Sequence, residues 1–127
     1  MLTDSSFPLY DLLFNKCNKI IHEDPSKGDI SIEEVREMID GIHKFEKDQM
    51  EHVFVIIRIH SLRNEKTQVF DTPYKGEKVK NFSSEEGDIK FDVRNMPPIL
   101  RRMLLEFVRM NNNINWFNKI IYTFLYY

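Results

Sequence analysis

The segment that decides the fold runs from Gly87 to Met110 and reads Gly-Asp-Ile-Lys-Phe-Asp-Val-Arg-Asn-Met-Pro-Pro-Ile-Leu-Arg-Arg-Met-Leu-Leu-Glu-Phe-Val-Arg-Met. Apolar and polar residues alternate at its start, which is the period of a half-buried β-strand. Pro97-Pro98 ends the strand, because proline has no amide hydrogen for a ladder and its fixed φ suits a helix start. Apolar residues at helical spacing follow: Leu100, Met103, Leu104, Phe107 and Val108. The segment therefore predicts a short strand that leads directly into an amphipathic helix.

Three helices are predicted upstream of this segment from apolar residues at helical spacing. The first covers Phe7 to Glu23, and the second begins at a capping box, Ser31-Ile32-Glu33-Glu34. The third, Gln49 to about Leu62, is apolar on more than one face, so we expect it at the centre of the fold. The stretch from Arg63 to Glu86 is polar, without long periodicity, and longer than an ordinary connection within a domain.

Asn111-Asn112-Asn113 follows the amphipathic helix and predicts its end. The remaining stretch, Ile114 to Tyr127, is rich in aromatic and apolar residues that are spaced for another helix. We expect it to pack on the N-terminal helix, since each has an apolar stripe to bury. Self-association through Trp116–Tyr127 is the alternative, and an interfacial membrane anchor fits less well because the stretch has few basic residues.

Length and composition restrict the class of protein. The 127 residues suit one domain, and a formal net charge of −2 gives no global basic surface for nucleic acid. The single cysteine, Cys17, excludes an intramolecular disulfide framework and a zinc ribbon, and it fits a reducing intracellular compartment. We see no secretory signal peptide and no apolar run near the ~20 residues that span a bilayer.

No motif indicates an enzyme, a cofactor or a metal. The sequence has no P-loop, dinucleotide fingerprint or nucleophile elbow. The four histidines, His22, His43, His52 and His60, lack His-x-x-x-His spacing and have no cysteine cluster beside them. Cys17 lies on the apolar stripe of the first helix, which favours a buried small hydrophobe over a catalytic Cys–His pair.

Two blocks of residues, Ser31–Arg58 and Asp88–Met110, carry a resemblance to a known family. The first contains Ser31-x-Glu33-Glu34-x-Arg36, Ile42-x-Lys44, Asp48-x-Met50 and Val53-x-x-Ile56-Ile57. The second contains Asp-Ile-Lys-Phe-Asp-Val-Arg-Asn-Met-Pro-Pro at 88–98. In this order they resemble the first two helices, the acidic strand and the third helix of the extra-terminal (NET) domain of the bromodomain and extra-terminal (BET) proteins. The resemblance covers roughly half of the chain.

This resemblance implies a non-enzymatic module that binds short peptides in which lysines alternate with apolar residues. The peptide adds as a strand beside the acidic strand, where backbone pairing supplies affinity and alternate side chains supply specificity. The implied partner is a chromatin, transcription or viral protein, and the implied location is the nucleus or a viral factory. The implied peptide-binding residues are Glu85, Glu86, Asp88, Ile89, Lys90, Phe91, Asp92, Val93, Val53, Ile56 and Ile57.

The sequence also departs from the family pattern. Lys90 and Arg101 stand where the family has an acidic and an apolar residue, and Glu85-Glu86 lies close enough to compensate for Lys90. The alternative is that the acidic residues Glu85, Glu86, Asp88 and Asp92 form only a solvated surface. We predict a mostly α single domain: an added N-terminal helix within 1–28, and a three-helix NET-like core over 29–110 with a strand or hairpin and an inserted loop at 63–86. An aromatic C-terminal helix over 111–127 completes it.

The inserted loop carries a candidate partner for the strand. Glu77-Lys78-Val79-Lys80-Asn81-Phe82 alternates lysine with other residues, much like a ligand of the family. Ser83 to Gly87 could turn it back onto Ile89–Val93 as a hairpin. The self-pairing residues would be Lys78, Val79, Lys80 and Phe82. The sequence leaves two possibilities open. The segment either occupies the peptide-binding groove beside the acidic strand or extends this groove to three strands.

A local basic group offers a further function. Arg94, Arg101, Arg102 and Arg109 lie around the predicted helix that follows the strand, and such a face can contact nucleic-acid phosphates. More often, arginines of this kind form a solvated helix face. Nucleic-acid binding is therefore an alternative to peptide binding rather than the main prediction.

Overall fold

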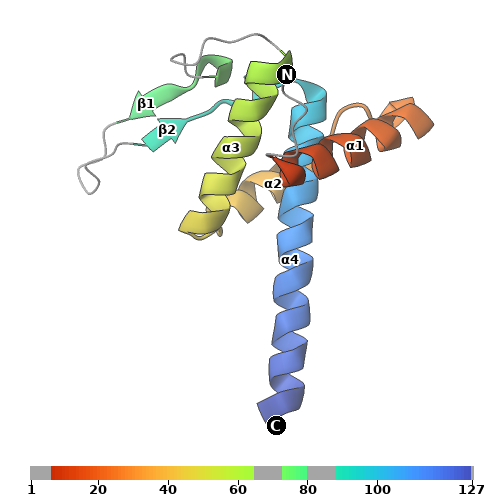
Figure 1. Cartoon of the computed structure of the whole chain (residues 1–127), viewed down its shortest axis with the longest axis vertical. Coiled ribbons are helices and arrows are strands. Elements are labelled where there is room, and N and C mark those ends of the chain that lie inside the picture. The colour runs from red at the N-terminus through yellow and green to blue at the C-terminus, as the bar shows by residue number, and fades with distance from the viewer. Residues whose placement is uncertain (1–6, 65–72, 80–87, 127) are drawn as a thin grey trace.

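The computed structural model describes residues 7–64, 73–79 and 88–126, with backbone only at 75, 78–79, 88–89 and 113–126. These residues form, in order, α1 (Pro8–Glu23), α2 (Ile32–His43), α3 (Lys47–Asn64), β1 (Glu77–Val79), β2 (Asp88–Lys90) and α4 (Pro98–Tyr126). The helices α1, α2 and α3 gather around the first half of α4, and the two strands lie to one side, near the end of α3 (Figure 1). The prediction of a mostly α fold is confirmed.

The helix starts follow the local sequence signals. Pro8 occupies the first turn of α1, where its missing amide hydrogen costs nothing. At α2 the Glu34 amide donates to Ser31 Oγ at 3.1 Å, and the Ser31 amide donates to Glu34 Oε1 at 3.0 Å. This reciprocal pair is the predicted capping box, and it fixes where α2 begins.

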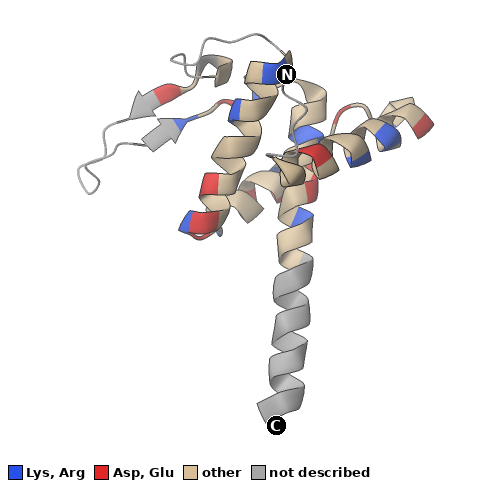
Figure 2. Cartoon of the chain, viewed as in Figure 1, with Lys and Arg blue, Asp and Glu red and all other residues tan. Residues whose placement is uncertain are grey.

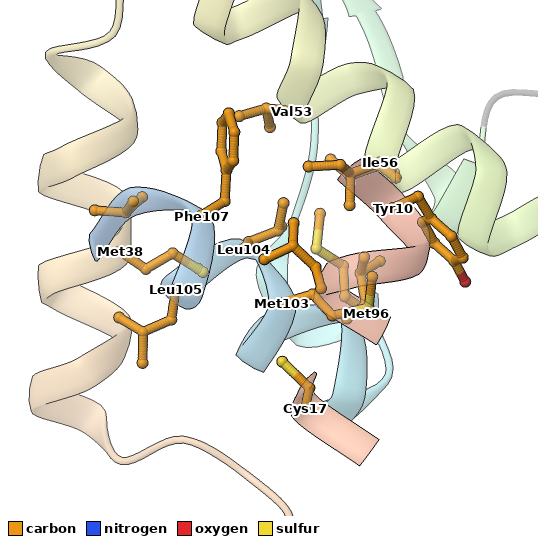
Figure 3. Packing of buried hydrophobic residues seen from close by; sticks show 14 of the residues in the cluster. Tyr10, Cys17, Met38, Val53, Ile56, Met96, Met103, Leu104, Leu105 and Phe107 are labelled. Carbon is orange, nitrogen blue, oxygen red and sulfur yellow. The ribbon is translucent and has the colours of Figure 1, made fainter. Parts of the chain in front are cut away.

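The central helix is α4, which corrects the expectation that α3 would be central. Every residue from 102 to 108 is buried, because α1, α2 and α3 all pack on this part of α4. By contrast, α3 leaves Met50 43% and Val55 41% exposed. The core lies between the helices, with Met103, Leu104 and Phe107 of α4 facing residues of the other three (Figure 3).

A separate C-terminal helix over 111–127 was the wrong expectation, because α4 continues without a break through all three asparagines. Asn111 Nδ2 donates to the Phe107 carbonyl at 2.8 Å, one turn back along the helix. Asparagine costs only about 0.7 kcal/mol relative to alanine in a helix, and no proline or glycine follows. The second half of α4 therefore extends away from the other helices as a single rod (Figure 1). The predicted packing of Trp116–Tyr127 on α1 involves side chains that lie outside the described part of the chain.

The strand β2 is shorter than predicted. Pairing ends at Lys90 rather than at Val93, and Val93–Asn95 forms a 3-10 turn, η3. Asp92 causes this change, because its Oδ1 accepts a hydrogen bond from the Arg94 amide at 2.9 Å and caps the turn. The alternating pattern therefore outlasts the strand by three residues.

Candidate peptide-binding site

The candidate site is built on the pairing of β1 with β2. The strands are antiparallel, with Glu77 opposite Lys90, Lys78 opposite Ile89 and Val79 opposite Asp88. Their connection, 80–87, lies outside the described residues. Within the described part of the chain the sheet has two strands, so each strand has a second edge that no other described strand covers. Such an edge offers amide and carbonyl groups to an added strand.

The segment before β1 is anchored on α3. Pro73 and Tyr74 are both buried, and the short turn that they begin, η2 (Pro73–Lys75), packs against α3. The Gly76 amide donates to the Pro73 carbonyl at 3.0 Å and closes the turn. Tyr74 has φ 52° and ψ 40°, a left-handed conformation that costs a bulky residue about 1–3 kcal/mol. Burial of the Tyr74 side chain offsets this strain and fixes where β1 starts.

The segment after β2 is anchored on the same helix. The half-buried Phe91 ring lies against Phe54 of α3, with ring centroids 6.4 Å apart. Asp92 accepts hydrogen bonds from Arg94 Nη2 at 2.7 Å and from Nε at 3.1 Å. These bonds and that from the Arg94 amide lower the pKa of Asp92 to about 2. Asp92 therefore stays ionised, but its charge is offset by Arg94 rather than free for a peptide lysine.

Three residues that were predicted to bind the peptide lie in the hydrophobic core instead. Val53, Ile56 and Ile57 are 6%, 1% and 2% exposed and belong to the hydrophobic core. Figure 3 shows Val53 and Ile56 there. The side of α3 that meets Phe91 carries Phe54 instead. Met50, one turn earlier, shares that side and is 43% exposed. Sequence reasoning missed Phe54 as a site residue because α3 has apolar residues on two faces, and the pattern does not show which one the core takes.

The remaining predicted residues are placed only in part. Asp88 and Ile89 lie in β2 and Lys78 and Val79 in β1, but only their backbone is described. Lys90 is exposed and Val93 is half-buried. The other four lie outside the described residues: Lys80, Phe82, Glu85 and Glu86.

The four arginines of the suggested nucleic-acid surface all have carboxylate partners within the chain. The closest partners are Asp92 for Arg94 at 2.7 Å, Asp29 for Arg101 at 3.1 Å, Glu34 for Arg102 at 3.5 Å and Glu37 for Arg109 at 2.8 Å. Basic and acidic residues are interspersed along the described helices in Figure 2 rather than separated into two faces. These arginines mainly join elements to one another, so they do not favour a free phosphate-binding surface.

The buried titratable groups are structural. The Tyr10 hydroxyl lies 2.8 Å from His60 Nδ1, and burial lowers the pKa of His60 to about 4. Burial raises the pKa of the Cys17 thiol to about 12, so this thiol stays protonated and unreactive. Among the residues that the structure describes, no three His, Cys, Asp or Glu side chains are grouped to hold a metal ion.

Fold and site together define a small helical domain with a two-stranded sheet fixed on one helix. No family model matches the chain, and no curated protein or solved structure is significantly similar to it. Within the described residues, no helix combines the length and the apolar character needed to cross a bilayer.

Proposed function

We propose that the chain is a protein–protein interaction module that binds a short peptide as a strand paired with β2. The observation that carries this proposal is the two-stranded sheet itself, because β2 can pair with a ligand strand through its backbone groups, either at its other edge or in place of β1. The sheet lies beside the helical bundle rather than within it (Figure 1). A ligand can therefore reach the sheet without disturbing the core.

The anchors at the base of the sheet support this function. Tyr74 holds the start of β1 on α3, and Phe91 holds the end of β2 on the same helix. An isolated pair of such short strands is marginally stable in water, so packing on α3 is what preforms the backbone of β2. A preformed edge lowers the ordering cost that a peptide must overcome on binding.

The proposed ligand alternates lysine with apolar residues. Asp88 is in β2, and the sequence places two more acidic residues, Glu85 and Glu86, shortly before it. A single exposed ion pair contributes only about 0–1 kcal/mol, so attraction requires several of them. Phe54 and Met50 on α3 would receive the apolar side chains of the ligand.

We include in this proposal that the domain is NET-like and that it meets its partner in the nucleus or in a viral factory. Both points are supported by the resemblance of Ser31–Arg58 and Asp88–Met110 to the extra-terminal domain of BET proteins. On this basis the partner is a lysine-rich linear motif of a chromatin, transcription or viral protein, met in the nucleus or in a viral factory. The proposed role is recruitment, with no catalytic step.

A peptide titration tests the proposal. A labelled peptide of alternating lysine and isoleucine is added while the backbone amide shifts of the protein are followed. We expect shifts centred on Asp88–Val93 and their loss in the variant Asp88→Lys, which reverses the charge of the acidic residue of β2. Phe54→Ala should weaken binding, whereas the exposed neighbour Val55→Ala is the matched control and should not. A peptide that shifts no amide of the protein or of its variants rules out the strand-adding function.

Self-association is a second candidate, favoured by one observation. The second half of α4 continues past the other helices as a single rod (Figure 1), and its sequence, Ile114 to Tyr127, is apolar and aromatic. Such a stretch suits a homodimer through Trp116–Tyr127. Light scattering on dilution tests this: a dimer that becomes monomeric when the chain is truncated after Asn112 supports it, and a monomer at all concentrations excludes it.

A further inference from the structure

We infer that β1 is a built-in strand that occupies the edge of β2 used by the peptide ligand, so that ligand binding requires β1 to leave. This inference rests on the proposed function, since it describes how the same site is regulated. The chain would then compete with its own ligand, and its affinity would depend on how often β1 is displaced.

The register places opposite charges against each other at one end of the two strands. Lys90 is the one basic residue of β2, and the residue opposite it in β1 is the acidic Glu77. At the other end, Val79 lies opposite Asp88 and is flanked in the sequence by Lys78 and Lys80. Opposite charges on facing strands favour that pairing and register. The built-in strand therefore has the lysine–apolar alternation proposed for the ligand, with an acid added where β2 has a lysine.

The structure also allows β1 to leave. Its pairing with β2 covers three residues on each strand, which is short for a sheet. Glu77 is the residue of β1 whose side chain the structure describes, and it is exposed. Tyr74 is held on α3 by its own burial, so it can stay in place as the anchor when β1 separates from β2. Displacement therefore opens the edge of β2 without opening the helical bundle.

This arrangement specifies the order of charged and apolar residues in the ligand, which the proposed function alone does not. A peptide that replaces β1 should have an acidic residue opposite Lys90, an apolar residue opposite Asp88 and a lysine between them, as β1 does. A peptide with lysines throughout would place like charges opposite each other at Lys90. If the edge is free one tenth of the time, the apparent affinity of any ligand is reduced about tenfold.

The experiment compares four proteins: the unaltered chain, Lys78→Pro, Lys78→Arg and Glu77→Lys. Proline at the centre of β1 breaks the strand, whereas arginine keeps both the strand and the charge. Two fluorescent probes are titrated: the alternating lysine–isoleucine peptide, and a peptide that copies residues 76–82, Gly-Glu-Lys-Val-Lys-Asn-Phe. Far-UV circular dichroism and the amide shifts of α4 establish that each variant keeps its helices. Glu77→Lys, which places two lysines opposite each other, is a second way to weaken β1.

We expect Lys78→Pro and Glu77→Lys to bind both peptides about tenfold more tightly than the unaltered chain and Lys78→Arg. Equal affinity in all four proteins would show that the ligand adds at the free edge of the sheet, which overturns the built-in competitor but leaves strand addition standing. No binding by any of the four would overturn the proposed function and the competitor together.

Discussion

Gly41 of α2 packs so closely on Val108 of α4 that a β-carbon at Gly41 would lie 2.3 Å from Val108 Cγ1. Gly41→Ala should therefore push α2 off α4 and lower the free energy of unfolding by about 1–3 kcal/mol, although alanine favours a helix more than glycine does. Urea denaturation measures this loss. Asp40→Ala, at the exposed neighbouring position, is the control and should be neutral. Combining Gly41→Ala with Val108→Ala should cost less than the sum of the two single changes.

Arg102 and Arg109 should differ greatly in their effect on stability, although both pair with Glu34. The Arg102 side chain is 6% exposed and also donates to the Lys27 carbonyl at 3.0 Å, so Arg102→Met removes both the ion pair and this hydrogen bond. We expect a loss of about 1.5–3 kcal/mol, the range for hydrogen bonds to a charged group, and only a small effect of salt. The Arg109 side chain is 39% exposed, and Arg109→Ala should cost less than about 1 kcal/mol. Denaturation at low and high salt compares them, and equal losses would contradict the assigned role of Arg102.

Stability should fall on acidification because His60 is buried beside Tyr10. Its pKa falls from 6.5 to about 4 in the folded protein, so the unfolded chain takes up the proton first. The stabilisation is thus fully present above pH 6.5 and is lost as the pH falls toward 4. Urea denaturation at several pH values should show this slope, and His60→Phe should flatten it. The exposed His43→Gln is the control, and an unchanged slope in His60→Phe would refute the assignment.

The pair Glu77 and Lys90 should contribute to the register of the sheet. Either Glu77→Lys or Lys90→Glu alone places like charges opposite each other, and each should speed hydrogen exchange of the amides of Asp88–Lys90. The double change restores opposite charges and should return exchange close to that of the unaltered chain. Amide exchange followed by NMR measures all four proteins. If the double variant exchanges as fast as the single ones, the two residues do not interact across the strands.

The helices could be predicted well from the sequence because their signals are local. A proline at the start of α1 and the reciprocal Ser31–Glu34 bonds at α2 involve only neighbouring residues. The spacing of Leu100, Met103 and Leu104 likewise indicated core positions of α4, although it did not indicate that Arg102, Leu105 and Glu106 are buried too. Such features depend on periodicity and capping, which the sequence states directly.

The site residues could be predicted less well because they depend on tertiary contacts. Phe54 and Ile57 are both apolar and lie on one helix, but only the packing of α4 decides that Ile57 is buried in the core while Phe54 meets Phe91. The end of β2 depends on whether Asp92 caps a turn or continues the alternation, and both readings fit the same residues. The left-handed Tyr74 has no sequence signal beyond its place in a Pro-Tyr-Lys-Gly turn.

Because α4 is unbroken, it fixes both the distance between its two ends and the rotation of one end relative to the other about the helix axis. A helix of 29 residues is about 44 Å long, so groups at its two ends keep a fixed separation comparable to the diameter of a small domain. Each residue also turns the helix by about 100°, so the end of the rod has a definite rotational phase relative to the bundle. One extra residue inserted after Asn112 would lengthen the rod by only about 1.5 Å but would rotate its outer part by more than a quarter turn. Any partner bound at both the bundle and the far end would register that rotation.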